Sequence, residues 1–158
     1  MAKPKINRLT VNENNDFDVI AVFDYQAIAD NATSSNQVTI GEIPAGGAVA
    51  YVGVYESVAL AGASDITLDV GTTTGDPDEF IDALDVDAMS APVFNTGDLM
   101  VQAAGTTTFL GGLLPVGATN TATDIVCEWN GTVASLTAGE VVIGIKYANL
   151  GRFATASN

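Results

Sequence analysis

The sequence predicts an all-β protein, an antiparallel β-sandwich or jelly roll with one short helix near residues 77–85 and an extended N-terminal arm. Short apolar runs recur along the chain between clusters of Gly, Pro, Ser and Asn, which is typical of sandwiches. Charged residues make up only 15% of the 158 positions, so the surface must be built largely from small neutral polar residues, which suit strands and turns. Residues 1–16 are expected to form the arm and residues 17–158 a single β-sandwich domain.

The strand predictions rest on apolar patterning. Residues 65–70 alternate strictly, with Ile66, Leu68 and Val70 on one side, as in a strand with one buried face. Turn-forming clusters such as Pro44-Ala45-Gly46-Gly47 separate the segments. The predicted strands are residues 17–28, 37–43, 48–60, 65–70, 124–129 and 141–147.

The last two of these segments each have one strongly apolar side. Cys127, the single cysteine, alternates with acidic residues and shares a face with Ile125 and Trp129. No Lys or His lies near it in the sequence to lower its pKa, so we expect a buried, inert thiol. In the closing segment, Val141, Ile143, Ile145 and Tyr147 form one side, and Val142, Gly144 and Lys146 form the other.

Segment 48–60 is unusual because both of its sides are apolar. Such a strand is either a central one covered by a loop, or one whose Tyr51 and Tyr55 face a subunit interface, where Tyr is enriched. We therefore include Tyr51 and Tyr55 among the candidate partner contacts. The two sides carry Val52, Val54, Val58 and Leu60, and Val49, Tyr51 and Tyr55.

The densest charge lies in residues 76–87, which hold six carboxylates in twelve positions. Their spacing does not match a calcium-binding EF-hand loop. A short helix explains them better, with Asp76 as N-cap, Pro77 at the first position and Glu79 completing a capping box. A divalent-cation site stays open as an alternative. The buried side of this helix would be Phe80, Ile81 and Leu84.

The charges are segregated along the chain. All 19 acidic residues lie between Val11 and Lys146, and the five basic residues lie at the two ends, for a net charge of −14. An anionic body repels nucleic acid and anionic membranes, so neither is an expected partner. The cations of the arm would suit an acidic partner surface, so the remaining candidate contacts are Lys3, Lys5 and Arg8.

The chain is not expected to be an enzyme. It has no His, and we find no nucleophile elbow, P-loop, zinc-protease or Cys-x-x-Cys motif. We therefore predict no catalytic residues, no cofactor and no metal site. Paired carboxylates leave a hydrolase as a weaker hypothesis, but nothing singles out one pair. No signal peptide is visible, and no apolar run approaches the length of a membrane span.

Two stretches carry a family resemblance. The first runs from Ile43-Pro44-Ala45-Gly46-Gly47 through AVAYVGVYESVAL to Asp65–Gly71 and Gly75–Asp82, and the second is residues 138–147. Together they resemble the head decoration (cement) proteins of tailed bacteriophages. The resemblance implies a β-sandwich or jelly-roll module that binds the outside of the capsid shell, often as a trimer, and that has no catalytic residues.

The expected function is therefore that of a capsid decoration protein located on the exterior of the virion. Its partners would be the major capsid protein and two further copies of itself in a homotrimer. The alternative is a receptor- or glycan-binding module of a phage tail or cell surface. In that case Trp129, the only tryptophan, would be the one large platform for a sugar.

Overall fold

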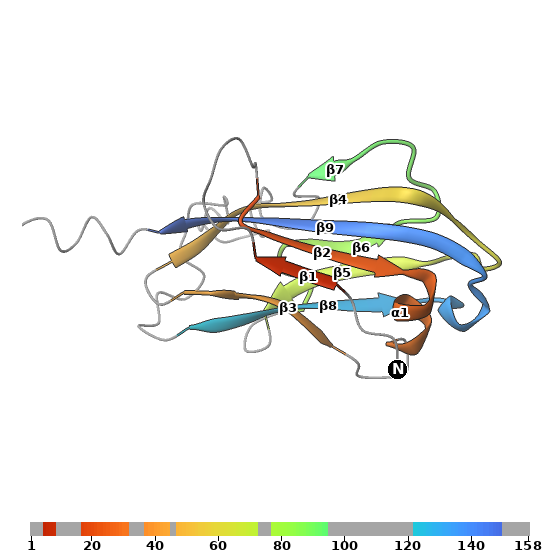
Figure 1. Cartoon of the computed structure of the whole chain (residues 1–158), viewed down its shortest axis with the longest axis horizontal. Coiled ribbons are helices and arrows are strands. Elements are labelled where there is room, and N and C mark those ends of the chain that lie inside the picture. Colours follow the sequence, from red (N-terminus) through yellow and green to blue (C-terminus); the bar gives the residue numbers. More distant parts are fainter. Residues whose placement is uncertain are drawn as a thin grey trace, which may run out of the picture.

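The computed structural model describes residues 5–8, 17–31, 37–44, 47–72, 77–94 and 122–149. They form two antiparallel sheets packed face to face (Figure 1), with strand orders β1-β2-β9-β4-β7 and β3-β8-β5-β6. The predicted all-β sandwich is thereby confirmed. The strands are β1 (Lys5–Arg8), β2 (Val19–Asp24), β3 (Val38–Ile43), β4 (Gly47–Ala61), β5 (Thr67–Thr72), β6 (Ile81–Asp85), β7 (Val93–Phe94), β8 (Thr123–Asn130) and β9 (Ala138–Asn149).

One hydrophobic core lies between the sheets. Alternate residues of each strand enter it, as the sequence pattern requires. In β2 these are Val19, Ala21 and Phe23, all buried. The rings of Phe23 and Trp129 meet edge to face with centroids 5.4 Å apart, so an aromatic pair links the two sheets.

The long strand β4 contains a bulge that changes which residues face the core. Its pairing with β9 shifts between Val49 and Tyr51. As a result Val49 is buried on the same side as Val52 and Val54, whereas the plain alternation placed it with the tyrosines. The expectation that Val49 lies on the outer face was therefore wrong.

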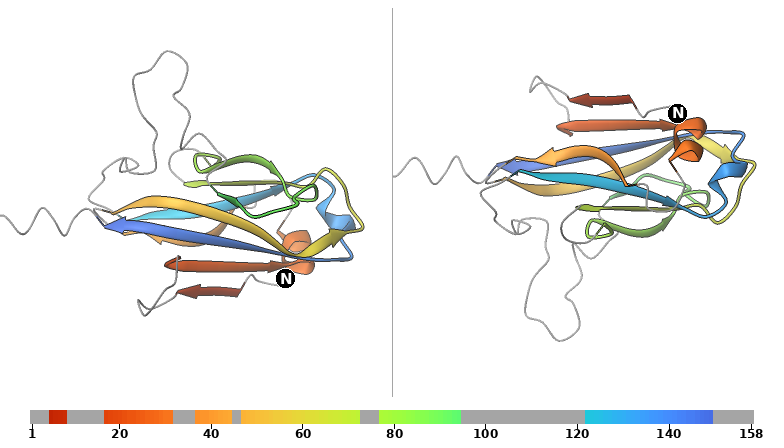
Figure 2. Two further views of the ribbon diagram at one scale, coloured as in Figure 1. Left: turned by 90° about the horizontal axis from the view of Figure 1, so that it is seen from above. Right: turned by 90° about the horizontal axis from the view of Figure 1, so that it is seen from below.

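A helix forms where the sequence predicted the end of a strand. Helix α1 (Tyr25–Asp30) begins because the Asp24 carboxylate accepts a hydrogen bond from the backbone N–H of Ala27 at 2.8 Å, which is an N-cap. It lies at the end of the sandwich where β8 passes through the 3₁₀ helix η3 (Val133–Ser135) into β9 (Figure 2). Among the described residues no helix is both long and apolar enough to cross a membrane.

The prediction of a helix near residues 77–85 was wrong, because this stretch forms a turn and then strand β6. The backbone of this stretch hydrogen-bonds to β5 and to the residues next to β5. For example, the Phe80 N–H donates to the Val70 carbonyl at 2.8 Å. The isolated helix would have been too short to overcome its nucleation cost, whereas pairing satisfies the backbone and still buries Phe80 and Ile81 completely. Leu84 is half-buried against the core. Asp76 lies outside the described residues.

Part of the N-terminal arm joins the chain's own sheet. Residues Lys5 to Arg8 form β1, an edge strand that pairs with β2 from Lys5 opposite Val22 to Arg8 opposite Val19. This is one of the two arrangements open to an arm strand, which could equally have joined a neighbour.

Candidate interaction surface

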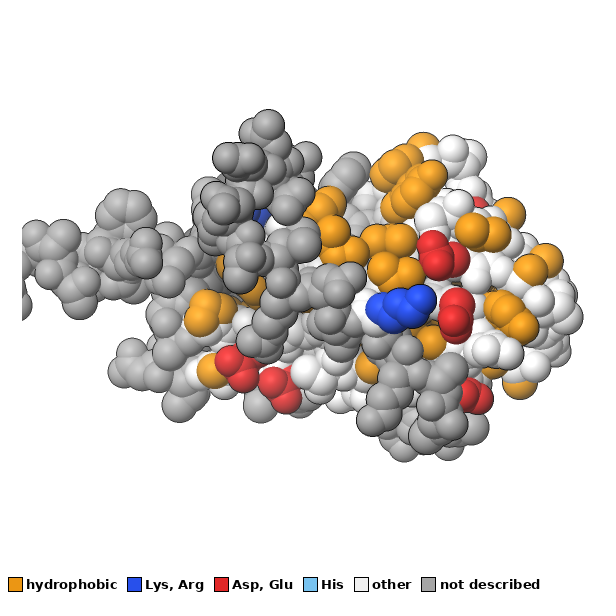
Figure 3. Space-filling view, in the orientation of Figure 1, with side chains coloured by type: hydrophobic (Ala, Val, Ile, Leu, Met, Phe, Trp, Pro, Cys, Tyr) orange, Lys and Arg blue, Asp and Glu red, His pale blue; other side chains and the backbone are white. Residues whose placement is uncertain are grey.

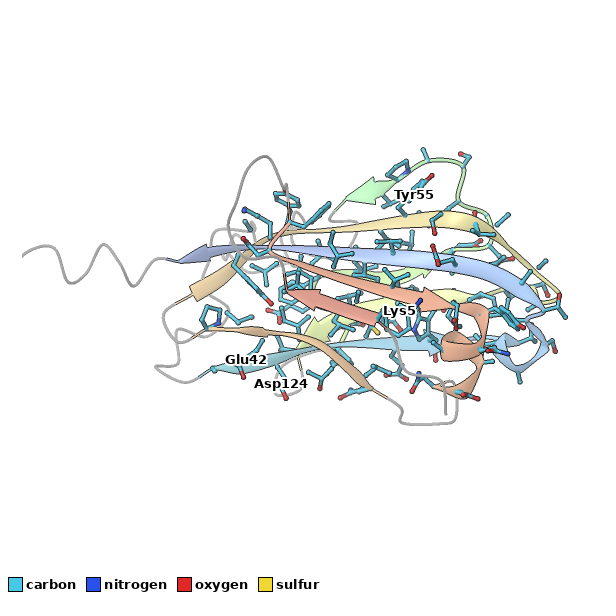
Figure 4. The ribbon with its side chains drawn as sticks, viewed as in Figure 1. Lys5, Glu42, Tyr55 and Asp124 are labelled. Carbon is cyan, nitrogen blue, oxygen red and sulfur yellow. The ribbon has the colours of Figure 1, made fainter. Side chains whose placement is uncertain are left out.

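Two of the predicted contact residues lie in one row across the outer face of the five-stranded sheet. Lys5 of β1 pairs with Val22, Val22 pairs with Val142 of β9, and Val142 pairs with Tyr55 of β4. Paired residues point to the same face of a sheet, so strand pairing brings Lys5 and Tyr55 to one surface. Figure 4 labels both. Lys3 and the side chain of Arg8 lie outside the described parts.

The next row across this face has two glycines at its centre. Ile20 of β2 pairs with Gly144, and Gly144 pairs with Gly53 of β4. Two opposed glycines leave no side chains at the centre of the sheet, and glycine within a strand often marks a place where another group approaches closely. Here the Phe17 ring lies on Gly144, since a Cβ added to Gly144 would come within 2.5 Å of a ring carbon of Phe17.

Phe17 is held in place by its neighbours. Its ring meets that of Tyr51 edge to face at a centroid distance of 5.5 Å, so Tyr51 is partly covered. The next residue, Asp18, donates its N–H to the Ile145 carbonyl at 2.8 Å. Its carboxylate accepts bonds from the backbone N–H of Tyr147 at 2.8 Å and from Lys146 Nζ at 3.2 Å. The entry of the chain into β2 is therefore fixed by main-chain and side-chain bonds.

An apolar groove of about 220 Å³ lies beside the Phe17 ring. Its lining atoms are almost all apolar. The volume is below the roughly 300–1,000 Å³ of small-molecule sites, and a sugar would find few hydrogen-bonding partners there. A single apolar side chain fits such a groove better. Its lining residues are Phe17, Ile20, Gly53, Val54, Tyr55, Pro92, Val142 and Gly144.

The two outer faces of the sandwich differ in charge. On the four-stranded sheet Glu42 lies directly opposite Asp124, and Asp69 lies opposite Glu128. Like charges in directly opposed positions destabilise a sheet, so this face carries a cost that the fold does not require. Figure 3 shows two adjacent acidic side chains at the positions that Figure 4 labels Glu42 and Asp124. The five-stranded sheet also has one opposed carboxylate pair, Asp24 and Glu140, but both described lysines, Lys5 and Lys146, belong to it.

Asp69 is a partly buried carboxylate of this face. Burial, together with the nearby Asp82 carboxylate, raises its pKa above the ordinary 3.8, although hydrogen bonds from the Ala83 N–H and the Asn130 side chain oppose the shift. These bonds are 2.6 and 2.9 Å long. The carboxylate therefore links β5 to β6 and β8.

Two side chains considered for chemistry or binding, Cys127 and Trp129, lie in the core. Cys127 is buried, and burial raises the pKa of its thiol. Trp129 is only 3% exposed, so it presents no sugar platform. Among the described residues no three side chains of Asp, Glu, Cys or His gather into a group that could hold a metal ion.

Sequence reasoning found part of this surface and missed the rest. It predicted Tyr55 and Lys5 as contacts and placed Gly144 on the outer side of its strand. It missed Phe17, Ile20 and Pro92, which line the groove. The isolated Gly144 in a strand was a usable signal, since it leaves space for a neighbouring ring, but the sequence could not say which ring.

No protein-family model and no curated protein matches the chain. Among solved structures, the chain is similar to one in the capsid asymmetric unit of cyanophage Pam1, with a TM-score of 0.54 and 18% sequence identity. The match covers 89% of this chain and 92% of that one. At this identity the likeness is one of fold, and it extends over nearly the whole of both chains.

Proposed function

We propose that this chain is a virion structural protein of a tailed bacteriophage, which binds the outer surface of the capsid shell and stabilises it as a decoration protein. The full-length fold likeness to a chain of the cyanophage capsid structure supports a place in the virion. The turn-and-strand resemblance to cement proteins supports the decoration role. No substrate is turned over in this proposal, and neither nucleic acid nor a membrane is a partner.

The observation that carries the proposal is the difference between the two sheet faces. The five-stranded face has an apolar centre with Lys5 and Lys146 on its strands. The four-stranded face carries two opposed carboxylate pairs with no described cation on its strands, whereas the five-stranded face carries one such pair, Asp24 and Glu140, beside its lysines. Desolvating unpaired carboxylates in an interface is costly, whereas burying apolar surface is favourable. The five-stranded face is therefore the one proposed to be buried in the particle, with its β1 edge at Lys5 against the major capsid protein and its groove in contacts between copies, and the acidic face points to solvent.

Stabilisation would follow from mass action. A protein that binds only the assembled shell lowers the free energy of that state by RT ln(1 + [L]/Kd), about 2.7 kcal/mol per site at a hundredfold excess over Kd. Copies are proposed to act as homotrimers, in which contacts between copies cover apolar residues of the five-stranded face and each trimer bridges neighbouring shell subunits.

The alternative of a glycan-binding module has lost its main support, because Trp129 lies in the core. The groove beside Tyr55 does not replace it, since almost none of its lining is polar.

The proposal is tested on capsids that lack the protein. Adding the purified chain should give saturable binding at a fixed number of copies per shell, and decorated capsids should release DNA at a higher temperature. Lys5→Glu, on the proposed contact face, should weaken binding several-fold. Asp124→Ala, the matched control on the opposite face, should bind normally. Absence of any saturable binding overturns the decoration role, and the reverse pattern of variants overturns the orientation.

A further inference from the structure

We infer that the apolar groove on the five-stranded sheet receives the Tyr55 side chain of a second copy of this chain. The inference rests on the homotrimer part of the proposed function and names the contact that would hold copies together. It concerns the groove and not the β1 edge at Lys5, which is proposed to meet the shell.

An exposed aromatic ring lies beside the groove. Among the described residues the exposed large hydrophobic side chains are Tyr55, which is 48% exposed, and Val58, which is 53% exposed. Both lie on β4, and Tyr55 also lines the groove. A half-exposed ring therefore lies at the rim of a hollow large enough for one apolar side chain. One copy can offer the ring and the next copy the hollow, a head-to-tail contact that can close into a ring of three.

The groove suits an aromatic ring. Its floor includes the opposed pair Gly53 and Gly144, and Phe17 already packs its ring against Gly144. A tyrosine ring from a second copy, placed on this floor, would lie between Phe17 and Tyr55 of the copy that provides the groove. Aromatic rings favour offset or edge-to-face arrangements of this kind, and a buried Tyr is a common interface anchor. The Tyr hydroxyl can stay at the wet rim.

Electrostatic repulsion limits where two copies can meet. Two copies with a net charge of −14 each repel one another, so their contact must avoid the carboxylate-rich surfaces. On the four-stranded face the exposed pair Glu42 and Asp124 has no described cation among its strands. On the five-stranded face Lys5 and Lys146 offset part of the charge of Asp18, Asp24 and Glu140. None of the described residues that line the groove is charged. A second copy is thus best tolerated at the groove.

The test measures self-association of the full chain by sedimentation over a range of protein and salt concentrations. The wild type should associate, more tightly at high salt because the repulsion between copies is screened. Tyr55→Ala should weaken association about tenfold or more, as expected for an aromatic anchor. Val58→Ala, on the same strand but outside the groove, should change it less than about threefold. Circular dichroism confirms that each variant is folded.

A cross-linking experiment identifies the contact directly. Tyr55→Cys and Ile20→Cys variants are mixed and oxidised, and an intermolecular disulfide should form between them, while Tyr55→Cys mixed with Glu42→Cys should give none. Because Cys127 is buried, it does not compete. A strictly monomeric wild type at high salt, or association unchanged by Tyr55→Ala, overturns the inference. A monomeric Tyr55→Ala variant that still binds shells leaves the decoration role intact while supporting the contact.

Discussion

Tyr147 connects the two sheets at one end of the sandwich, and Gly41 makes room for it. The backbone N–H of Glu42 in β3 donates to Tyr147 Oη at 3.2 Å. A Cβ added to Gly41 would lie 2.6 Å from the same oxygen. We therefore predict that Gly41→Ala destabilises the protein by forcing the phenol away from β3.

The size of the effect follows from its parts. Overpacking costs about 1–3 kcal/mol. The lost hydrogen bond costs about 0.5–1.5 kcal/mol. Alanine in a strand offsets this by about 0.5–1 kcal/mol relative to glycine. The net loss is about 0.5–4 kcal/mol, and each kcal/mol lowers Tm by about 2–4 °C in a chain of this length.

A double-mutant cycle tests the cause. In the Tyr147→Phe background the oxygen is absent, and the other neighbours of the added Cβ, Ile145 Cδ1 at 3.4 Å and Ile125 Cδ1 at 3.8 Å, can accept it. There Gly41→Ala should be neutral or stabilising by up to about 1 kcal/mol. Urea denaturation of the four proteins gives the coupling free energy. An equal loss in both backgrounds would refute the argument.

Two further predictions concern the acidic face. The folded state holds a proton on Asp69 more tightly than the unfolded state does, so this residue makes stability fall as pH rises from the ordinary pKa of 3.8 through its raised pKa. Urea titrations between about pH 3 and pH 6 should show that slope more strongly in wild type than in Asp69→Asn, and identical slopes would contradict it. Glu42→Lys should pair with Asp124 and stabilise the fold by about 0.2–1 kcal/mol. A gain that persists undiminished in high salt would show that charge is not the cause.

The strands were predictable because alternation of apolar and polar residues follows directly from burial of one face of a strand. Residues 65–70 and 141–147 alternate in the sequence, and Leu68 and Ile143 are fully buried as that alternation requires. A single inserted residue reverses which residues of a strand face the core, so alternation in the sequence then no longer predicts burial. The bulge beside Val49 has no composition signal of its own, so the pattern on one side of it cannot be carried to the other.

The two helix errors have a common origin. Asp24 and Asp76 both precede residues that could start a helix, and local sequence cannot rank them. At Asp24 the following residues Ala27 and Ile28 find a place against the end of the core. After Asp76, the edge of β5 offers Phe80 and its neighbours backbone partners, and long-range pairing overrides local capping.

The candidate surface was only half predictable for a related reason. Tyr55 was recognisable as a surplus aromatic on a doubly apolar strand. The groove beside it joins Phe17, Gly144 and Pro92, which are separated widely in the chain and meet only through strand order. No local pattern contains that information.

The opposed carboxylates of the four-stranded sheet have a consequence at the scale of a whole particle. If each bound copy turns that face outward, a decorated shell presents a dense layer of negative charge in place of its own surface. The layer, not the shell beneath it, would then set the electrophoretic mobility of the particle. It would also keep particles dispersed at low ionic strength and make their approach to anionic cell surfaces depend on salt.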